Sequence, residues 1–203
     1  MELKEIEKRM HGGGLYFCND EELQKIQTAA QEKLYEYNHT RPSEGEKRAA
    51  LLHQMCAEIG TGCWLEPPLH ADWGCRFVHM GSGVYANFNL TLVDDTHIYI
   101  GDHVLFGPNV TIDTATHPIH PGLRSRQAQY NKPVFIEDNV WLGAGTIVLP
   151  GVRIGKNSVI GAGSVVTADI PANVVAVGAP CRVLRQINED DLRCYDKGKL
   201  IDL

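Results

Sequence analysis

The sequence predicts a mainly β fold, in which a helical N-terminal segment is followed by a coil of short, stacked parallel strands. Two observations predict it. Residues 136–166 have an unbroken period of six, whereas before about residue 60 the apolar residues recur at helical spacing. Every sixth position of the repeating tract is apolar: Ile136, Leu142, Val148, Ile154, Ile160 and Val166.

A period of six matches neither an amphipathic helix nor an alternating strand, whose periods are roughly 3.6 and 2 residues. It is typical of a coil in which one residue per repeat points into a narrow interior and glycine or asparagine supplies each turn. The positions two residues earlier are small or β-branched: Val134, Val140, Thr146, Val152, Ser158 and Ser164. The period continues upstream through Ile98, Val104 and Val110. Separate strands of a sandwich would not keep this phase.

Residues 1–60 are predicted to be the helical segment. Four apolar residues of the stretch 19–39 have helical spacing: Leu23, Ile26, Ala30 and Leu34. Asn19 or Asp20 is a suitable cap for this helix. In the stretch 43–60, Ser43 and Glu46 form a capping-box pattern and Gly60 is a suitable stop. The sequence therefore predicts two helices joined through "NHTRPS".

Composition excludes several classes of function. The 203-residue chain has room for a core, with 43% hydrophobic residues, and its formal charge of −6 argues against a nucleic-acid partner. No apolar run approaches the roughly 20 residues that span a bilayer. The start "MELKEIEKRM" lacks the apolar region of a secretory signal, and the six cysteines match no zinc template. We therefore expect a cytoplasmic protein with reduced thiols, no membrane partner and no metal.

One segment interrupts the repeat. Residues 113–133, "DTATHPIHPGLRSRQAQYNKP", contain prolines and polar residues that do not continue a strand ladder, so we expect an extruded loop. Histidine, with an unperturbed pKa near 6.5, suits proton transfer at neutral pH. His117 and His120 are both candidates by spacing. The predicted organisation is a helical segment 1–60, a coil 61–185 carrying this loop, and a tail 186–203.

The stretch "IGKNSVIGAGSVVT" resembles the hexapeptide repeat of left-handed parallel β-helix acyltransferases. Five further stretches resemble, in order, the galactoside and maltose O-acetyltransferases: "EYNHTRPSEGEKR", "EPPLHADWG", "YANFNLTLVDD", "HPIHPGLR" and "GAPCRVLRQI". The resemblance implies a left-handed parallel β-helix and a homotrimer with active sites between subunits. It also implies acetyl transfer from acetyl-CoA to a sugar hydroxyl.

The resemblance assigns roles at the reaction centre. The "H-P-x-H" histidine matches His117, which would act as general base for direct transfer in a ternary complex, with His120 as the alternative. Asn87 would stabilise or position the reacting groups, and Asp95 would bind the acceptor sugar. Asp72 is a further acceptor-site candidate.

The acceptor side departs from the family pattern. Cys18 stands where the resembling enzymes carry an acceptor-binding aspartate, and Asp20 lies two residues further on. The segment 73–87 is also one residue longer than the family pattern. The acceptor therefore stays open among a galactoside, maltose, glucose and an unrelated small alcohol.

The donor side follows the family more closely. Arg182 and Arg185 match arginines that contact coenzyme A, and a guanidinium pairs well with phosphate. The resemblance places the pantetheine arm against four residues, through main chain at the alanines: Ala144, Ala162, Thr167 and Ala168.

Two other functions are possible for a coil of this kind. A carbonic anhydrase of the hexapeptide-repeat type would bind zinc through three histidines, and His97, His103, His117 and His120 lie in the middle coils. A non-catalytic β-helix could serve as a binding module. Neither accounts for "HPIHPGLR" together with "PCRVLR".

Overall fold

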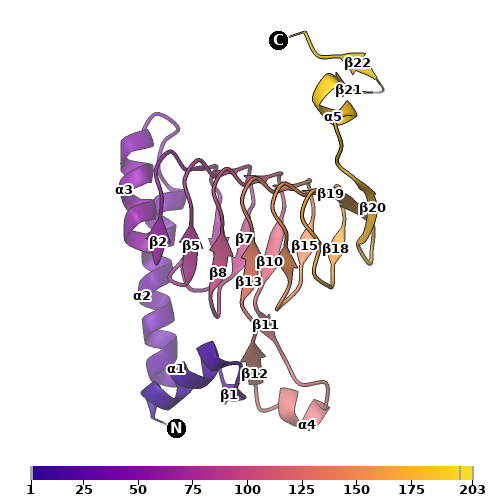
Figure 1. The fold of residues 1–203 in the computed structure, drawn as a ribbon. Coiled ribbons are helices and arrows are strands. Elements are labelled where there is room, and N and C mark those ends of the chain that lie inside the picture. The colour runs from indigo at the N-terminus through magenta and orange to yellow at the C-terminus, as the bar shows by residue number, and fades with distance from the viewer. Residues whose placement is uncertain (1, 197, 203) are drawn as a thin grey trace.

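The computed structural model describes residues 2–196 and 198–202, and it has the predicted architecture: a left-handed parallel β-helix behind N-terminal helices (Figure 1). Three stacked parallel sheets form the faces of a prism, which the chain visits in a fixed order. Face 1 contains β2 (Glu58–Ile59), β5 (Val78–Met80), β8 (Ile98–Ile100), β13 (Val134–Ile136) and β16 (Arg153–Ile154). Face 3 contains β4 (His70–Ala71), β7 (Thr91–Val93), β10 (Thr111–Asp113), β15 (Ile147–Val148) and β18 (Val165–Val166).

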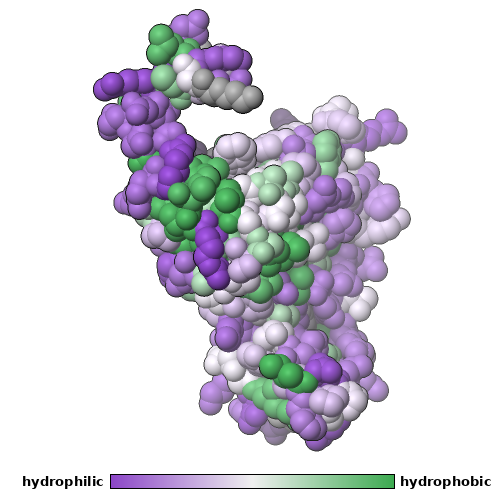
Figure 2. All heavy atoms as spheres, turned by 90° about the vertical axis from the view of Figure 1, so that its right-hand side faces the viewer, coloured by the Kyte–Doolittle hydropathy of each residue, from purple (hydrophilic) through white to green (hydrophobic). Residues whose placement is uncertain are grey.

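Face 2 is the longest sheet and closes the coil. It contains β3 (Trp64–Leu65), β6 (Tyr85–Ala86), β9 (Leu105–Phe106), β14 (Trp141–Leu142), β17 (Val159–Ile160), β19 (Val174–Val177) and β20 (Arg182–Gln186). β20 pairs antiparallel with β19 and ends the stack. Apolar surface gathers at this end of the molecule, where Val177, Val183 and Leu184 are exposed (Figure 2).

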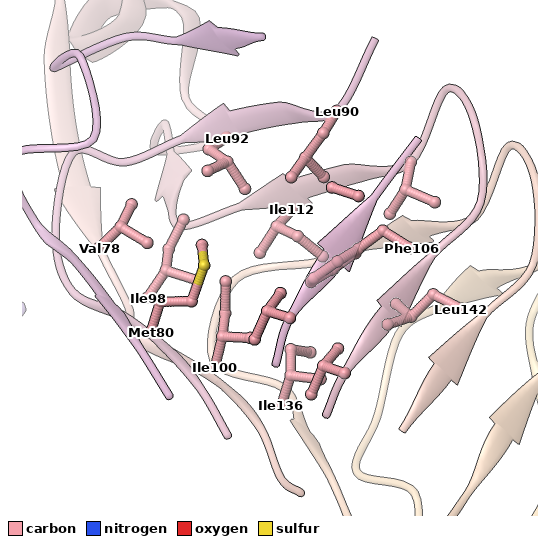
Figure 3. Close-up of a cluster of buried hydrophobic side chains, with 14 of the residues drawn as sticks. Val78, Met80, Leu90, Leu92, Ile98, Ile100, Phe106, Ile112, Ile136 and Leu142 are labelled. Carbon is pink, nitrogen blue, oxygen red and sulfur yellow. The ribbon is translucent and has the colours of Figure 1, made fainter. Parts of the chain in front are cut away.

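The core is the line of inward side chains that runs along the prism (Figure 3). Leu142 stands opposite Phe106 in one neighbouring strand and Ile160 in the other, so each coil packs on the next. The six predicted inward positions are all buried, and so are the positions two residues before them. Two residues per repeat are thus buried, not one. Burying each aliphatic side chain contributes about 1.5–3 kcal/mol.

The turns use the residues that the repeat predicted. Asn89 and Asn109 have φ angles of 61° and 59°, and the amide of Asn89 donates to Asn109 Oδ1 over 3.0 Å. A similar ladder joins Asn139, Asn157 and Asn173 on the corner between faces 1 and 2. Asparagine tolerates this left-handed conformation better than most residues, and the amide ladder links successive coils.

The N-terminal segment contains α1 (Leu3–Gly12), β1 (Tyr16–Phe17), α2 (Glu21–Asn38) and α3 (Gly45–Met55). Asp20 caps α2 by accepting from the backbone N–H groups of Glu22 and Leu23, as predicted. The Ser43 cap was wrong, because α3 begins after Glu44 without a side-chain cap. Gly60 is not its stop either. The chain leaves the helix at Met55 because Glu58 already pairs with face 1.

The loop extruded from the coil has structure of its own. It contains β11 (Ala115–Thr116), α4 (Pro121–Arg124) and β12 (Ala128–Asn131), and β12 pairs antiparallel with both β11 and β1. The loop is therefore fixed to the N-terminal segment. Beyond β20, α5 (Asp190–Arg193), β21 (Cys194–Tyr195) and β22 (Lys199–Leu200) project away from the coil (Figure 1). None of the described helices is long and apolar enough to cross a membrane.

Candidate functional site

The extruded loop holds His117 over the corner between faces 3 and 1, which we call the 3–1 corner. His117 follows β11, and its Nδ1 lies 2.8 Å from the carbonyl oxygen of Ala128 in β12. A carbonyl oxygen only accepts, so Nδ1 must carry the proton and donate. In the neutral imidazole Nε2 is then the nitrogen without a proton, and this is the tautomer in which Nε2 can act as a general base.

His120 is exposed, as His117 is, but it makes a different contact. It stands before α4, where its Nδ1 accepts from the backbone N–H of Gly122 over 3.1 Å. This contact uses the lone pair of Nδ1 as a local cap of α4, and the neutral ring then carries its proton on Nε2. The geometry therefore favours His117 over His120 as the base.

Carboxylates collect beneath His117 because the strands of face 3 are in register. Ala71 pairs with Leu92, and Leu92 with Ile112, so Asp72, Asp95 and Asp113 emerge near the same corner. Burial raises the pKa of Asp95 and of Asp113, and the charge of His117 opposes both shifts. The effect of His117 on both aspartates indicates that the three groups lie near one another.

Asp72 is held from the helical side. Gln27 and Gln31 of α2 both donate from Nε2 to its main-chain oxygen, over 3.0 and 3.1 Å. Its side chain keeps an exposed edge, yet partial burial, with repulsion from Asp95 and Asp113, raises its pKa to about 6. Asp72 is therefore only partly charged in mildly acidic solution.

Cys18 lies at this corner too. Its Sγ donates to the carbonyl oxygen of Gln127 over 3.4 Å, and burial, with the charge of Asp95, raises the pKa of its thiol. Asp20 cannot easily replace a family aspartate, because its carboxylate already caps α2. Trp73 is a buried core residue that packs with Met10 and Tyr16.

Asp94 is the chain neighbour of Asp95. It is fully buried, and its Oδ1 accepts from the backbone N–H of Trp73 over 2.7 Å. Its Oδ2 is buried without a hydrogen-bond partner in the described part of the chain. Burial raises the pKa of Asp94 to about 8, so this carboxyl is mostly protonated at neutral pH.

Asn87 lies at a different corner, between faces 2 and 3, which we call the 2–3 corner. The coil stacks Asn87 under Gly107 and Gly143, as the bonds from Asn87 N to Phe106 O and from Gly107 N to Leu142 O show. A Cβ at Gly107 would lie 2.7 Å from the backbone nitrogen of Ala144, so glycine is required there. Asn87 Oδ1 accepts from the backbone N–H of Phe88 over 2.8 Å.

The predicted donor-side residues fall at both corners. Ala144 and Ala162 stack at the 2–3 corner, where Gly163 N donates to Ala144 O over 2.8 Å. Thr167 and Ala168 follow β18 at the 3–1 corner. One chain thus places His117 with the acidic residues, and Asn87 with the alanines, at separate corners of the prism.

The two predicted arginines stand on β20. Arg182 is exposed and donates to the carbonyl oxygen of Cys181 over 2.7 Å. Arg185 makes a two-bond pair with Asp191, with N–O distances of 2.7 and 2.6 Å, which lowers the pKa of Asp191 to about 2. The guanidinium of Arg185 therefore already has an anionic partner within the chain.

Sequence reasoning missed three residues at the 3–1 corner. Tyr16, Gln129 and Asn131 are buried and hydrogen-bond with one another and with Asp95. Polar residues alternating along "AQYN" were the available signal, since buried amides in a strand need partners. Within the described residues, no group of three or more His, Cys, Asp or Glu side chains could hold a metal ion.

Known proteins resemble this chain in sequence. The family model "Maltose acetyltransferase hexapeptide capping motif" matches residues 9–60, and "Bacterial transferase hexapeptide (six repeats)" matches residues 133–168. The galactoside O-acetyltransferase of Lactococcus lactis subsp. lactis (strain IL1403) is 62% identical over 196 residues, which cover 97% of this chain and 95% of that protein. This chain belongs to the galactoside and maltose O-acetyltransferase family.

Solved structures of this O-acetyltransferase family agree with the fold. A galactoside acetyltransferase in complex with coenzyme A superposes with a TM-score of 0.94 at 45% identity, covering 98% of both chains. A maltose O-acetyltransferase from Clostridium difficile 630 gives 0.88 at 43% identity, covering 91% of this chain and 98% of that one. The chain is therefore an acetyl-CoA-dependent O-acetyltransferase, and neither the carbonic anhydrase nor the non-catalytic alternative stands.

The buried Asp94 predicts a pH-dependent stability. The pKa of Asp94 is about 8 in the folded state and about 3.8 in the unfolded state. The unfolded chain therefore loses this proton at lower pH, and the free energy of unfolding falls as pH rises from about 4 to about 8. Asp94→Asn keeps the acceptor for Trp73 N–H and removes the charge. We expect the variant to melt about 5 °C above wild type at pH 8.5, and the gap to shrink toward pH 4. Melting followed by circular dichroism checks this, and a gap that does not change with pH would contradict it.

Proposed function

We propose that the protein transfers the acetyl group of acetyl-CoA to a hydroxyl of a sugar, with His117 as general base in a ternary complex. The observation that carries the proposal is the 2.8 Å contact between His117 Nδ1 and the Ala128 carbonyl oxygen, which makes Nε2 the proton acceptor of the neutral imidazole. A sugar hydroxyl is a weak nucleophile toward a thioester unless a base takes its proton during attack.

The reaction follows from these groups. Nε2 of His117 takes the hydroxyl proton while the sugar oxygen attacks the thioester carbon. The bond to the carbonyl oxygen becomes single, and Asn87 Nδ2 of a neighbouring subunit donates to the resulting oxyanion. The tetrahedral intermediate then collapses, the carbon–sulfur bond breaks, and the coenzyme A thiolate receives the proton from the imidazolium. Asp95 and Asp113 stabilise the imidazolium while it exists.

The acceptor is a sugar of the galactoside, maltose or glucose type. Asp95 and Asp72 lie at the same corner as His117, and a carboxylate accepts hydrogen bonds from two hydroxyl groups at once. Cys18 adds a thiol beside them. Relatives named for galactoside and maltose acetylation support a sugar over an unrelated alcohol.

Coenzyme A would lie along the coil, with its pantetheine arm against the backbone at Ala144 and Ala162 and its phosphates at Arg182 and Arg185. Thr167 and Ala168, at the 3–1 corner, would border it from the neighbouring subunit of the proposed assembly. Ala144 and Ala162 are exposed, and their small side chains leave room for the arm beside the main chain. We place the enzyme in the cytoplasm, where acetyl-CoA is made and where its six free cysteines stay reduced.

The active form is a homotrimer with each active site between two subunits. His117 and Asn87 stand at different corners of one prism, so a complete site needs the 3–1 corner of one subunit and the 2–3 corner of another. Face 2 also exposes a line of large apolar side chains: Trp64, Tyr85, Leu105 and Trp141. Such a line on adjacent strands favours burial in an assembly.

His117→Ala is expected to lower kcat by about 10²–10⁴, the usual contribution of general-base catalysis, with little change in KM for acetyl-CoA. Release of coenzyme A thiol across a panel of sugars measures it. His120→Asn is the matched control, because asparagine can still accept from Gly122 N–H. If His120→Asn lost turnover and His117→Ala kept it, His120 would be the base.

Shared active sites predict complementation between two inactive variants. His117→Ala and Asn87→Ala should each be poorly active alone. When they are unfolded and refolded together, roughly a quarter of the sites should combine an intact His117 with an intact Asn87. Thiol release should then recover to that fraction of wild type. Activity that stays at the level of the separate variants would place both residues in one subunit's site.

The Arg185–Asp191 pair predicts a competition with the donor. Coenzyme A phosphate must displace the Asp191 carboxylate, so Asp191→Asn should lower KM for acetyl-CoA by about two- to fivefold, the range for an exposed ion pair. Asp190→Asn removes the same charge from α5 and is the control. A raised KM in Asp191→Asn would mean that Asp191 instead holds Arg185 in its binding orientation.

A further inference from the structure

A buried group of polar side chains lies beneath the catalytic loop and joins three distant parts of the chain. It consists of Tyr16 of β1, Gln129 and Asn131 of β12, and Asp95 at the 3–1 corner. None is more than 8% exposed. Side chains buried this far need partners inside the protein, and each finds them in the others.

Gln129 is the member that contacts the carboxylate. Its Nε2 lies 2.8 Å from Asp95 Oδ1 and 2.8 Å from Tyr16 Oη, and 3.1 Å from Asn131 Oδ1. An amide has two protons on this nitrogen, so it can donate to Asp95 and to one further oxygen of the group. The Gln129 amide is therefore held between Asp95 on one side and Tyr16 or Asn131 on the other.

Asn131 holds the same aspartate by its main chain. Its Nδ2 lies 3.1 Å from the carbonyl oxygen of Asp95, 3.0 Å from Tyr16 Oη and 3.2 Å from the carbonyl oxygen of Met10. Asp95 is thus fixed at its backbone by Asn131 and at its carboxylate by Gln129. Because β12 also carries the carbonyl of Ala128 that orients His117, one strand positions both the base and the carboxylate.

The charge on Asp95 depends on this contact. Burial raises the pKa of Asp95, and the hydrogen bond from Gln129 is the strongest of the opposing effects. The indole of Trp73 also favours the charged form, although its buried Nε1 meets no acceptor at hydrogen-bond distance within the described residues. Without the amide, Asp95 would be protonated at a higher pH and would bind hydroxyl groups less well.

We propose that Gln129 is a positioning residue for the acceptor: it fixes the Asp95 carboxylate beneath His117, while Tyr16 and Asn131 hold the Gln129 amide in place. This inference rests on the proposed function, in which Asp95 binds the acceptor sugar. It adds that the N-terminal segment, through Tyr16, takes part in acceptor recognition.

Gln129→Met removes the amide and nearly preserves the volume of the side chain. We expect KM for the acceptor sugar to rise about tenfold or more, the size of losing one hydrogen bond to a charged group, while KM for acetyl-CoA stays within twofold. The acid limb of kcat/KM for the acceptor should move to higher pH, since Asp95 keeps its proton longer. Gln24→Met, the same change on the exposed side of α2, is the control and should leave all these values unchanged.

Two further variants separate the inference from the proposed function. Asp95→Asn should raise acceptor KM and abolish the part of the acid limb that depends on the Asp95 carboxylate, leaving the part that depends on the base. Combining it with Gln129→Met should add little, because Gln129 acts through Asp95. If Asp95→Asn left acceptor KM unchanged, the acceptor role of Asp95 would fail. If Asp95→Asn raised it and Gln129→Met did not, only the positioning role would fail.

If Gln129→Met does not fold, Tyr16→Phe tests the same network. Tyr16→Phe removes only the hydroxyl that accepts from Gln129 and Asn131. It should raise acceptor KM by about threefold with the same shift of the acid limb, because a loosened amide donates less well. A Tyr16→Phe enzyme with wild-type acceptor KM and pH profile would overturn the role of the network.

Discussion

The stacking of inward aliphatic side chains at every sixth residue is the constraint on which the rest of the structure depends. Most strands of the coil are only two or three residues long, too short to be stable alone. Each is held by main-chain bonds to the coils on both sides, as Leu105 N to Val140 O at 2.9 Å and Trp141 N to Ser158 O at 3.0 Å illustrate. A slip of one residue would turn Leu142 outward and Trp141 inward, so register and burial fix each other.

The same constraint explains how the coil accepts an extruded loop. The chain leaves the prism after Asp113 and returns at Val134, which pairs with Ile98 in the register that an uninterrupted coil would use. The insertion therefore leaves the core intact. Its own position depends on β1, which pairs with β12 and brings Tyr16 under the loop. The loop that carries His117 is thus held by the helical segment as well as by the coil from which it extends.

Sequence patterns correctly predicted the features that depend on residues close together in the chain. The inward positions, the asparagine turns and the Asp20 cap are all local, and they were correct. The Gly60 stop failed because pairing of β2 with face 1 decides where α3 ends, and the Ser43 cap failed because α3 begins after Glu44. The buried network could not be foreseen from spacing, since Gln129 and Asp95 are 34 residues apart and Tyr16 is 113 residues from Gln129. Only the fold of the loop onto β1 brings them together.

The division of the predicted site between two corners follows from the geometry of a three-sided coil. A prism points its corners in three directions, so His117 and Asn87 cannot face one another across a single core. In the proposed mechanism each subunit supplies the base and carboxylates to one site and the oxyanion donor to another. In that mechanism catalysis requires association, which burial of the exposed apolar line of face 2 would favour. The proposal thus makes the feature that stabilises the coil, a narrow core inside a three-sided prism, also the reason why a lone chain would be an incomplete enzyme.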